Sequence, residues 1–196
     1  MIVSFLILAV VVVLVLVGYR TSRAGYESAP CQVVRSSSKF ELRDYPALTV
    51  VETPMTRTGN NADGSFMRLF RFITGGNEAK QKIAMTTPVF MSGSDSNATM
   101  AFVLPAKLKP GAVPKPTDGS LTVRDLPAGR FAVLRFRGGR NTKNEAAALQ
   151  QLKDWMKAEG LSVLSPPPVF AYFDPPWTPG FMRRNEVMLQ TEAGKP

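Results

Sequence analysis

One order of strand-like and helix-like patterns occurs twice in this sequence, and that order leaves few ways for the chain to fold. Residues 39–55 read as two strands, because apolar and β-branched residues alternate or run together there. Residues 61–77 then place apolar side chains at helical spacing, and two strand-like runs follow over residues 82–105. The second half repeats this order, with strands over 120–139, a helix over 142–160, and strands over 168–174 and 185–191.

Each half therefore reads β-β-α-β-β, with one amphipathic helix. The helices are expected to end at glycine, at Gly75-Gly76 and at Gly160, and a Pro- and Lys-rich stretch over residues 105–120 connects the halves. Such halves bury their apolar faces by forming one curved antiparallel sheet or an open barrel, with the helices packed outside. The predicted fold class is α+β, a distorted antiparallel β-barrel with two flanking helices.

The N-terminal segment has a different character. Residues 1–17 contain no charged side chain, and Gly18 and Tyr19 extend the apolar run. This pattern predicts one transmembrane helix over residues 1–19, acting as a signal anchor, with a cleaved signal peptide as the alternative. Arg20 and Arg23 follow the run and favour a single-pass protein with its domain in the cytoplasm. The predicted boundaries are then a juxtamembrane tether over residues 20–29 and a folded domain over residues 30–191.

Composition removes several classes of chemistry. The sequence has no histidine and a single cysteine, Cys31, so His/Cys metal sites, Ser-His triads, Cys-His pairs and internal disulfides are excluded. The formal net charge is +9, but the basic residues are scattered and match no nucleic-acid-binding module. We therefore predict no metal site, no catalytic residue and no nucleic-acid partner.

Six short motifs carry a family resemblance. "KFELRDYP", "FITGGN", "KIAMTTPV", "MAFVLP", "FDPPWTP" and "RRNEV" occur in this order between about residues 29 and 189. Together they resemble the SOUL or haem-binding protein family. The resemblance implies a distorted β-barrel with two helices, related to the effector-binding domains of some bacterial transcription activators. It also implies non-covalent binding of haem or another tetrapyrrole in an apolar groove that includes the first helix of the domain.

That helix supplies the candidate ligand-binding residues. Phe66, Phe70 and Ile73 fall on one stripe, Met67 lies beside it, and Arg71 flanks it. The resemblance associates Phe66, Phe70 and Arg71 with the ligand, although the same spacing also fits a core face. Without histidine, we expect apolar contact rather than iron ligation to hold the ring. The residues still able to coordinate iron are Met67, Tyr172, Tyr45 and Cys31.

The segment before the last strand, Arg183-Arg184-Asn185-Glu186, has two interpretations. In the first, Glu186 pairs with an arginine and Asn185 ties the proline-rich crossover to a neighbouring strand. In the second, one arginine binds a ligand carboxylate, because a guanidinium fork suits that group.

Taken together, the sequence predicts a membrane-tethered binding protein for haem or a related tetrapyrrole. The alternative is a small-ligand sensing or interaction module of the effector-binding fold. A third interpretation is an enzyme that uses Glu186 and Tyr172 for acid-base chemistry.

Overall fold

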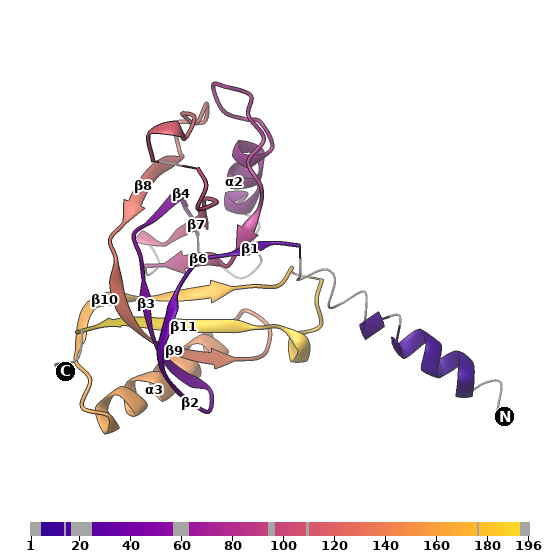
Figure 1. Ribbon diagram of the computed structural model, residues 1–196, viewed down its shortest axis with the longest axis vertical. Helices are drawn as coiled ribbons and strands as arrows, with labels where there is room; N and C mark the ends of the chain where they lie inside the picture. The colour runs from indigo at the N-terminus through magenta and orange to yellow at the C-terminus, as the bar shows by residue number, and fades with distance from the viewer. Residues whose placement is uncertain are drawn as a thin grey trace.

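The computed structural model of the protein describes residues 5–13, 15–16, 25–56, 63–93, 97–108, 110–175 and 177–192. From residue 27 onward, the described residues form eleven strands, two α-helices and two short 3-10 helices (Figure 1). They are β1 (Glu27–Ser28), β2 (Gln32–Ser37), β3 (Phe40–Tyr45), β4 (Leu48–Pro54), α2 (Ser65–Ile73), β5 (Thr86–Thr87), β6 (Val89–Ser92), β7 (Thr99–Val103), η2 (Pro110–Ala112), β8 (Thr122–Leu126), β9 (Gly129–Phe136), α3 (Thr142–Ala158), β10 (Val163–Tyr172), η3 (Gly180–Met182) and β11 (Asn185–Thr191).

The prediction of a membrane-spanning helix, and with it of a single-pass membrane protein, is contradicted. The helical residues described in the N-terminal segment are 5–13 and 15–16, whereas a span needs about 20 apolar residues in one helix. Of the helices described, none is both long and apolar enough to cross a membrane. Arg20 and Arg23, which supported the predicted orientation, lie outside the described residues, as does the first half of the predicted tether.

The main sheet has nine strands in the order β2-β3-β9-β11-β10-β6-β7-β4-β8, and every neighbouring pair is antiparallel. The two predicted halves are present as β3-β4-α2-β6-β7 and β8-β9-α3-β10-β11. In the two halves β3 corresponds to β8, β4 to β9, β6 to β10 and β7 to β11. When each strand is replaced by its counterpart, the sheet order from β3 to β8 is the same order read backwards. The fold is therefore pseudo-twofold, with β6 and β10 adjacent at its centre.

The sheet curls into a half-barrel but does not close. Its two edges are β2 and β8, and no ladder joins them in the part of the chain that the structure describes. All six residues of β2 are exposed, so this edge strand has no layer packed over it. The α+β class with two flanking helices is confirmed, while the predicted barrel is an open, curled sheet. A separate pair of two-residue strands, β1 and β5, runs parallel.

Strand alternation divides the buried side chains among three clusters. The first, under α2, includes Val51, Leu69, Phe72, Ile73, Met100 and Phe102. The second, under α3, includes Ala132, Leu134, Leu152, Met156, Phe170, Val187 and Leu189. The third fills the inside of the curl and includes Tyr45, Val50, Phe90, Val103, Val133, Ala171 and Met188. Tyr172 packs against both helix clusters and so lies where the two halves meet.

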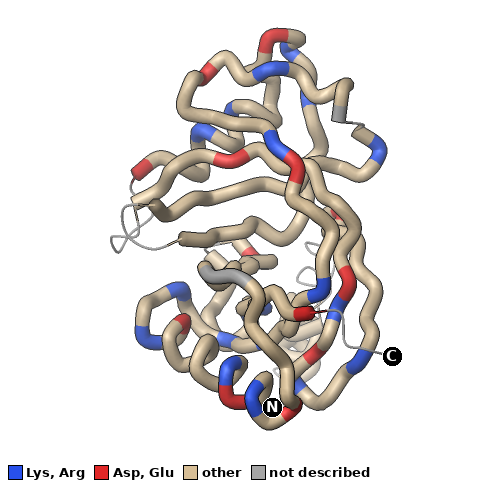
Figure 2. The backbone as a smooth tube through the Cα atoms, turned by 90° about the vertical axis from the view of Figure 1, so that its left-hand side faces the viewer, with Lys and Arg blue, Asp and Glu red and all other residues tan. Residues whose placement is uncertain are grey.

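Local hydrogen bonds set the ends of the helices. At the start of α2, the Asp63 carboxylate accepts the Ser65 backbone N–H (3.1 Å) and its hydroxyl (2.8 Å). At the start of α3, Asn141 Oδ1 accepts the Asn144 backbone N–H at 2.9 Å, as an N-cap residue does. Gly160 follows α3 with φ of 66°, a left-handed conformation that favours glycine. Figure 2 shows charged residues of both signs on many parts of the described backbone, whereas residues 83–93 and 97–106 carry none.

Candidate functional site

Helix α2 carries apolar side chains on two faces. Leu69, Phe72 and Ile73 are buried in the cluster beneath it. On the other face Phe66, Met67 and Phe70 remain 38%, 48% and 39% exposed. Large apolar side chains exposed together on one helical turn are unusual for a surface that meets only water. The structure therefore brings three of the predicted ligand residues together and places Ile73 apart from them, in the core.

Ring contacts hold this exposed face in a fixed shape. The rings of Phe66 and Phe70 stack with centroids 6.0 Å apart and planes 13° apart. Phe66 also packs edge-on against Phe102 of β7, at 5.3 Å and 65°. Because Phe102 is buried, it anchors Phe66 to the sheet. The result is a preorganised apolar surface, which lowers the entropy lost when a flat ligand binds.

Two arginines border this surface and have different roles. Arg68 is occupied within the protein, where it donates to Thr53 Oγ1 (3.1 Å) and to the carbonyl oxygens of Asp63 (2.8 Å) and Pro54 (2.7 Å). Arg71 is exposed in the last turn of α2. A ligand carboxylate at the rim of the apolar face would therefore meet Arg71 rather than Arg68.

These residues fit a tetrapyrrole ring better than they fit its iron. The stacked phenylalanines match a wide apolar ring, and Arg71 suits a propionate. Of the four possible iron ligands, Met67 alone is on this face. The Tyr45 hydroxyl accepts a hydrogen bond from Arg43, and the Tyr172 hydroxyl donates one to Glu145. Cys31 is exposed elsewhere. Within the described ranges no three His, Cys, Asp or Glu side chains lie close enough to hold a metal ion.

A second polar site lies at one end of the curled sheet, around Glu186. The Glu186 carboxylate is fully buried and accepts two hydrogen bonds from Arg43, at 2.7 and 3.0 Å. Arg184 donates to the same carboxylate at 2.8 and 3.2 Å, and Arg135 Nε lies 3.4 Å from it. Glu41 bridges Arg43 (2.6 Å) and Arg135 (2.7 Å). We call these five residues the Glu186 network.

The network keeps Glu186 and Arg43 charged. Burial raises the pKa of Glu186, but hydrogen bonds and charge from Arg43 and Arg184 lower it more, so the net pKa lies below its usual value. Burial lowers the pKa of Arg43, and Glu186 more than offsets this, so its pKa is raised. Burial raises the pKa of Tyr45, beside Arg43, to about 12, so its phenol is neutral at pH 7.

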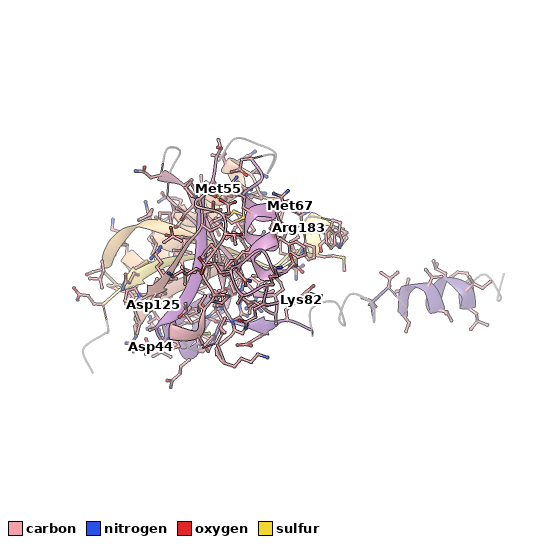
Figure 3. The ribbon with its side chains drawn as sticks, turned by 90° about the horizontal axis from the view of Figure 1, so that it is seen from above. Asp44, Met55, Met67, Lys82, Asp125 and Arg183 are labelled. Atoms are coloured by element: carbon pink, nitrogen blue, oxygen red, sulfur yellow. The ribbon has the colours of Figure 1, made fainter. Side chains whose placement is uncertain are left out.

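The other residues singled out near the last strand lie elsewhere. Arg183 donates through Nε to the Thr178 carbonyl oxygen, within its own crossover, at 2.7 Å. Asn185 donates to the Gly138 carbonyl oxygen at 2.9 Å and ties the last strand to the loop before α3. Figure 3 shows Met67 and Arg183 on the same side of the domain, away from Asp44 and Asp125.

The proposed acid-base pair is not assembled. Tyr172 and Glu186 lie on neighbouring strands, but Tyr172 packs between the helix clusters while Glu186 bonds to Arg43 in the Glu186 network. The Tyr172 hydroxyl instead donates to the buried Glu145 carboxylate of α3. Arg140 Nε lies 3.9 Å from the same carboxylate.

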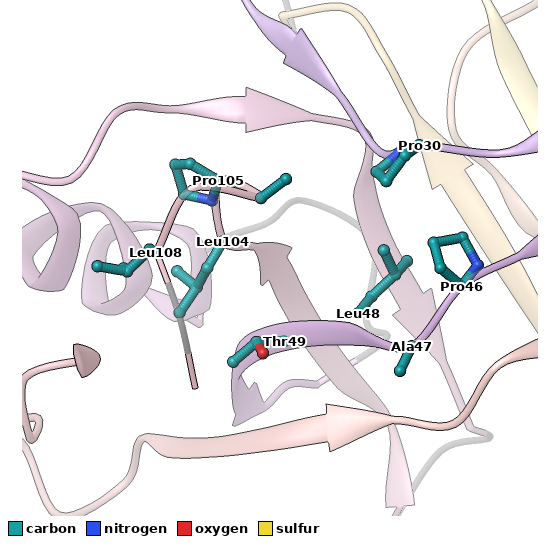
Figure 4. Close-up of a pocket in the computed structure, with 9 residues that line it drawn as sticks. Pro30, Pro46, Ala47, Leu48, Thr49, Leu104, Pro105 and Leu108 are labelled. Carbon is teal, nitrogen blue, oxygen red and sulfur yellow. The ribbon is translucent and has the colours of Figure 1, made fainter. Parts of the chain in front are cut away.

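A pocket of about 210 Å³ opens beside the first residues of β4 (Figure 4). No residue that lines it carries a charge, and none was singled out from the sequence. They are Pro30, Pro46, Ala47, Leu48, Thr49, Leu104, Pro105, Ala106 and Leu108. The pocket is smaller than the 300 Å³ or so that a drug-sized ligand needs, so it offers no space for a whole tetrapyrrole.

Sequence reasoning missed three residues that surround Glu186 from β3. Glu41, Arg43 and Tyr45 alternate along that strand, which places all three on one of its faces. This alternation was a usable signal for a polar face turned inward. Arg135, also missed, carried no such signal, because its pairing with Glu186 depends on the register of β9 and β11.

Solved structures share this fold at low sequence identity. An uncharacterized conserved protein from Listeria innocua has a TM-score of 0.60 at 11% identity, over 79% of this chain and 92% of that one. A hydrolase from Listeria innocua has a TM-score of 0.60 at 10% identity, over 81% and 94%. The EcmrR C-terminal domain has a TM-score of 0.55 at 14% identity, over 78% and 96%. At such identities the likeness shows the fold alone.

Curated proteins give no match to the chain. The sequence model of one family, described as "SOUL heme-binding protein", matches residues 26–190. The match runs from the residue before β1 almost to the end of β11, so it includes α2 and the Glu186 network. The chain belongs to the SOUL haem-binding protein family.

Proposed function

We propose that this protein binds haem or a related tetrapyrrole against the exposed face of α2, without histidine ligation. The observation that carries the proposal is the exposure of Phe66, Met67 and Phe70 beside Arg71, on a helix whose opposite face is already buried in the core. Family membership supports the ligand class. The small-ligand sensing module remains the alternative, and the EcmrR C-terminal domain supports it only through its fold.

Apolar contact supplies enough free energy for this binding. A tetrapyrrole that buries a few hundred Å² at about 25 cal/mol per Å² supports micromolar affinity after association costs are met. Arg71 adds about 1 kcal/mol at most, because a rim ion pair is screened by solvent. Since none of this involves the metal, the free porphyrin should bind nearly as well as haem.

Titration of the full chain with hemin and with metal-free protoporphyrin tests this directly. We expect the two dissociation constants to agree within about tenfold, a difference of 1.4 kcal/mol or less. Phe66→Ser and Phe70→Ser should weaken the binding of both ligands, and Arg71→Ala should weaken both more modestly. Leu164→Ser, which removes another exposed apolar side chain from β10, is the control and should change neither.

Iron ligation would give a different pattern. Hemin would then bind about a hundredfold more tightly than protoporphyrin, and a substitution at Met67, Tyr172 or Cys31 would abolish the difference. If neither ligand bound, tetrapyrrole binding would be rejected in favour of the sensing module.

A further inference from the structure

We infer that Arg135 and Arg184, at the exposed edge of the Glu186 network, form a binding site for a small carboxylate ligand. Their side chains are 45% and 40% exposed, whereas those of Arg43 and Glu186 are almost fully buried. This site is separate from the exposed face of α2 and does not rest on the function proposed for that face.

The charges of the network do not balance. Three arginines, Arg43, Arg135 and Arg184, share two carboxylates, Glu41 and Glu186. Tyr45, the other polar side chain bonded to Arg43, has a neutral phenol and adds no negative charge. One positive charge is therefore left without a partner inside the network, and it sits where solvent and ligands have access.

The two exposed arginines converge on one atom. Arg184 Nη2 lies 2.8 Å and Arg135 Nε lies 3.4 Å from Oε1 of Glu186. Both guanidinium groups thus lie around a single oxygen of a carboxylate that is buried and bonded to Arg43. Among the contacts of the described residues, Nη1 of each group donates no hydrogen bond, so each keeps N–H groups for a ligand.

Neighbouring residues fix the orientation of Arg184. Its guanidinium carbon lies 4.2 Å from the centre of the Phe173 ring, which covers one face of the group and leaves its edges to form hydrogen bonds. The Asp174 carboxylate accepts the backbone N–H of Arg184 at 2.6 Å, so it braces the main chain at this residue. An arginine fixed in this way loses little side-chain entropy when it binds an anion.

The geometry favours a carboxylate over a more highly charged anion. Within the five residues of the network the surplus is one positive charge, which one carboxylate balances, and a planar fork of N–H donors pairs with two carboxylate oxygens. The simplest test ligand is acetate, which has the charge and the two oxygens but no other recognition element.

The experiment follows the arginine Nε–Hε signals of the full chain by NMR while sodium acetate replaces sodium chloride at constant ionic strength. We expect saturable shifts of the Arg135 and Arg184 signals. Arg184→Gln and Arg135→Gln should each weaken acetate binding at least fivefold. Glu186 keeps its two hydrogen bonds from Arg43 in both variants, so both should fold. Arg184→Lys, which keeps the charge but loses the fork, should give an intermediate affinity.

Arg124→Gln is the matched control, because Arg124 is also about half exposed and also pairs with a glutamate, Glu52. Acetate affinity should be unchanged in this variant. Shifts that never saturate, or an equal loss of affinity in Arg124→Gln, would overturn the site. Tighter binding of inorganic phosphate than of acetate would overturn the carboxylate assignment. Displacement of acetate by protoporphyrin would overturn the separation from the α2 face, while failure of protoporphyrin to bind would leave the acetate result standing.

Discussion

Glu186 shows how many ion-pair and hydrogen-bond partners surround a single buried carboxylate. Removing a carboxylate from water costs several kcal/mol, and attraction to a partner offsets this only when the geometry is good. Here Arg43 forms a two-pronged contact and Arg184 adds two further hydrogen bonds. Because Arg43 comes from β3 whereas Arg184 directly precedes β11, the Glu186 side chain fixes how β3 meets the last strand.

Glu186→Gln should lower the free energy of unfolding by about 3–5 kcal/mol, because Arg43 would remain buried with its main counter-charge removed. Urea denaturation of the variant and of the parent protein measures the change. Glu52→Gln removes an acidic partner from a pair whose arginine is half exposed, and it should cost about 1 kcal/mol or less. Equal losses in the two variants would mean that burial of the Glu186 network adds nothing to the strength of its ion pairs.

The stabilisation by Glu186 should also depend on pH with a definite sign. Its pKa in the folded protein is below the ordinary value of 4.5, so below that pH the unfolded chain binds a proton that the folded chain does not. The contribution is therefore complete above about pH 4.5 and declines as the pH falls towards the folded pKa. Measured in urea, the gap in stability between the parent protein and Glu186→Gln should be constant from pH 7 to about 5 and should then narrow. A gap that widened in acid would refute this.

Residue types alone predicted only part of this arrangement. Glu186 and Arg184 stand close together in the sequence, so a pairing between them was a reasonable interpretation. The stronger partner, Arg43, is far away in the chain, and nothing in "KFELRDYP" indicates that it reaches Glu186. Such a contact depends on which strands become neighbours, and local pattern does not specify that.

At the scale of single elements, one face of α2 packs into the core and the other is the surface proposed to bind the ligand. Leu69 is fully buried beneath the helix, whereas Phe66 contributes to the exposed surface. The helical period correctly predicted the helix but could not assign its faces, because apolar residues occur on both. Ile73 was assigned to the ligand face for this reason.

Leu69→Ala should destabilise the protein by about 2–5 kcal/mol, through lost apolar contact and the cavity left behind. Phe66→Ser should cost roughly 1 kcal/mol, because much of that ring is already in contact with water. Thermal or urea denaturation distinguishes the two. Comparable losses would mean that Phe66 belongs to the core and would weaken its assignment to a binding surface.

The N-terminal segment shows, also for a single element, that hydropathy alone does not predict the extent of a helix. A charge-free apolar run reports the affinity of side chains for an apolar phase, but it does not determine where a helix begins and ends. Two-residue strands such as β1 and β5 are equally hard to predict, since they are too short to show any period.

For the whole molecule, the order of elements could be predicted but the closure of the sheet could not. Each β-β-α-β-β half was readable from apolar periods, and both are present. Whether the sheet closes depends on whether its outermost strands pair. The residues of β2 and β8 look much the same in a closed barrel and in an open curl, because either one suits strands at a boundary with solvent.

Backbone hydrogen exchange should map this open architecture. Amides in the inner strands, from β3 to β4 in the sheet order, are paired on both sides and should exchange slowly, while those in the edge strands β2 and β8 should exchange most rapidly among the main-sheet strands. Exchange measured by mass spectrometry or NMR tests the ranking. Strong protection of both edges together would indicate that they are paired with each other or covered.

The strand order also has a consequence for how the chain folds. β3 belongs to the first half but pairs with β9 of the second, and β8 belongs to the second half but pairs with β4 of the first. The first strand of each half thus pairs only with strands outside that half, so neither half forms a complete sheet alone. Pairing Phe40 with Leu134 requires a very long loop of chain to close before either half gains its outer strand. Folding rates fall as such distant contacts come to dominate. We therefore expect the domain to fold slowly and as one unit, with closure of that loop, rather than formation of either helix, as the slow event.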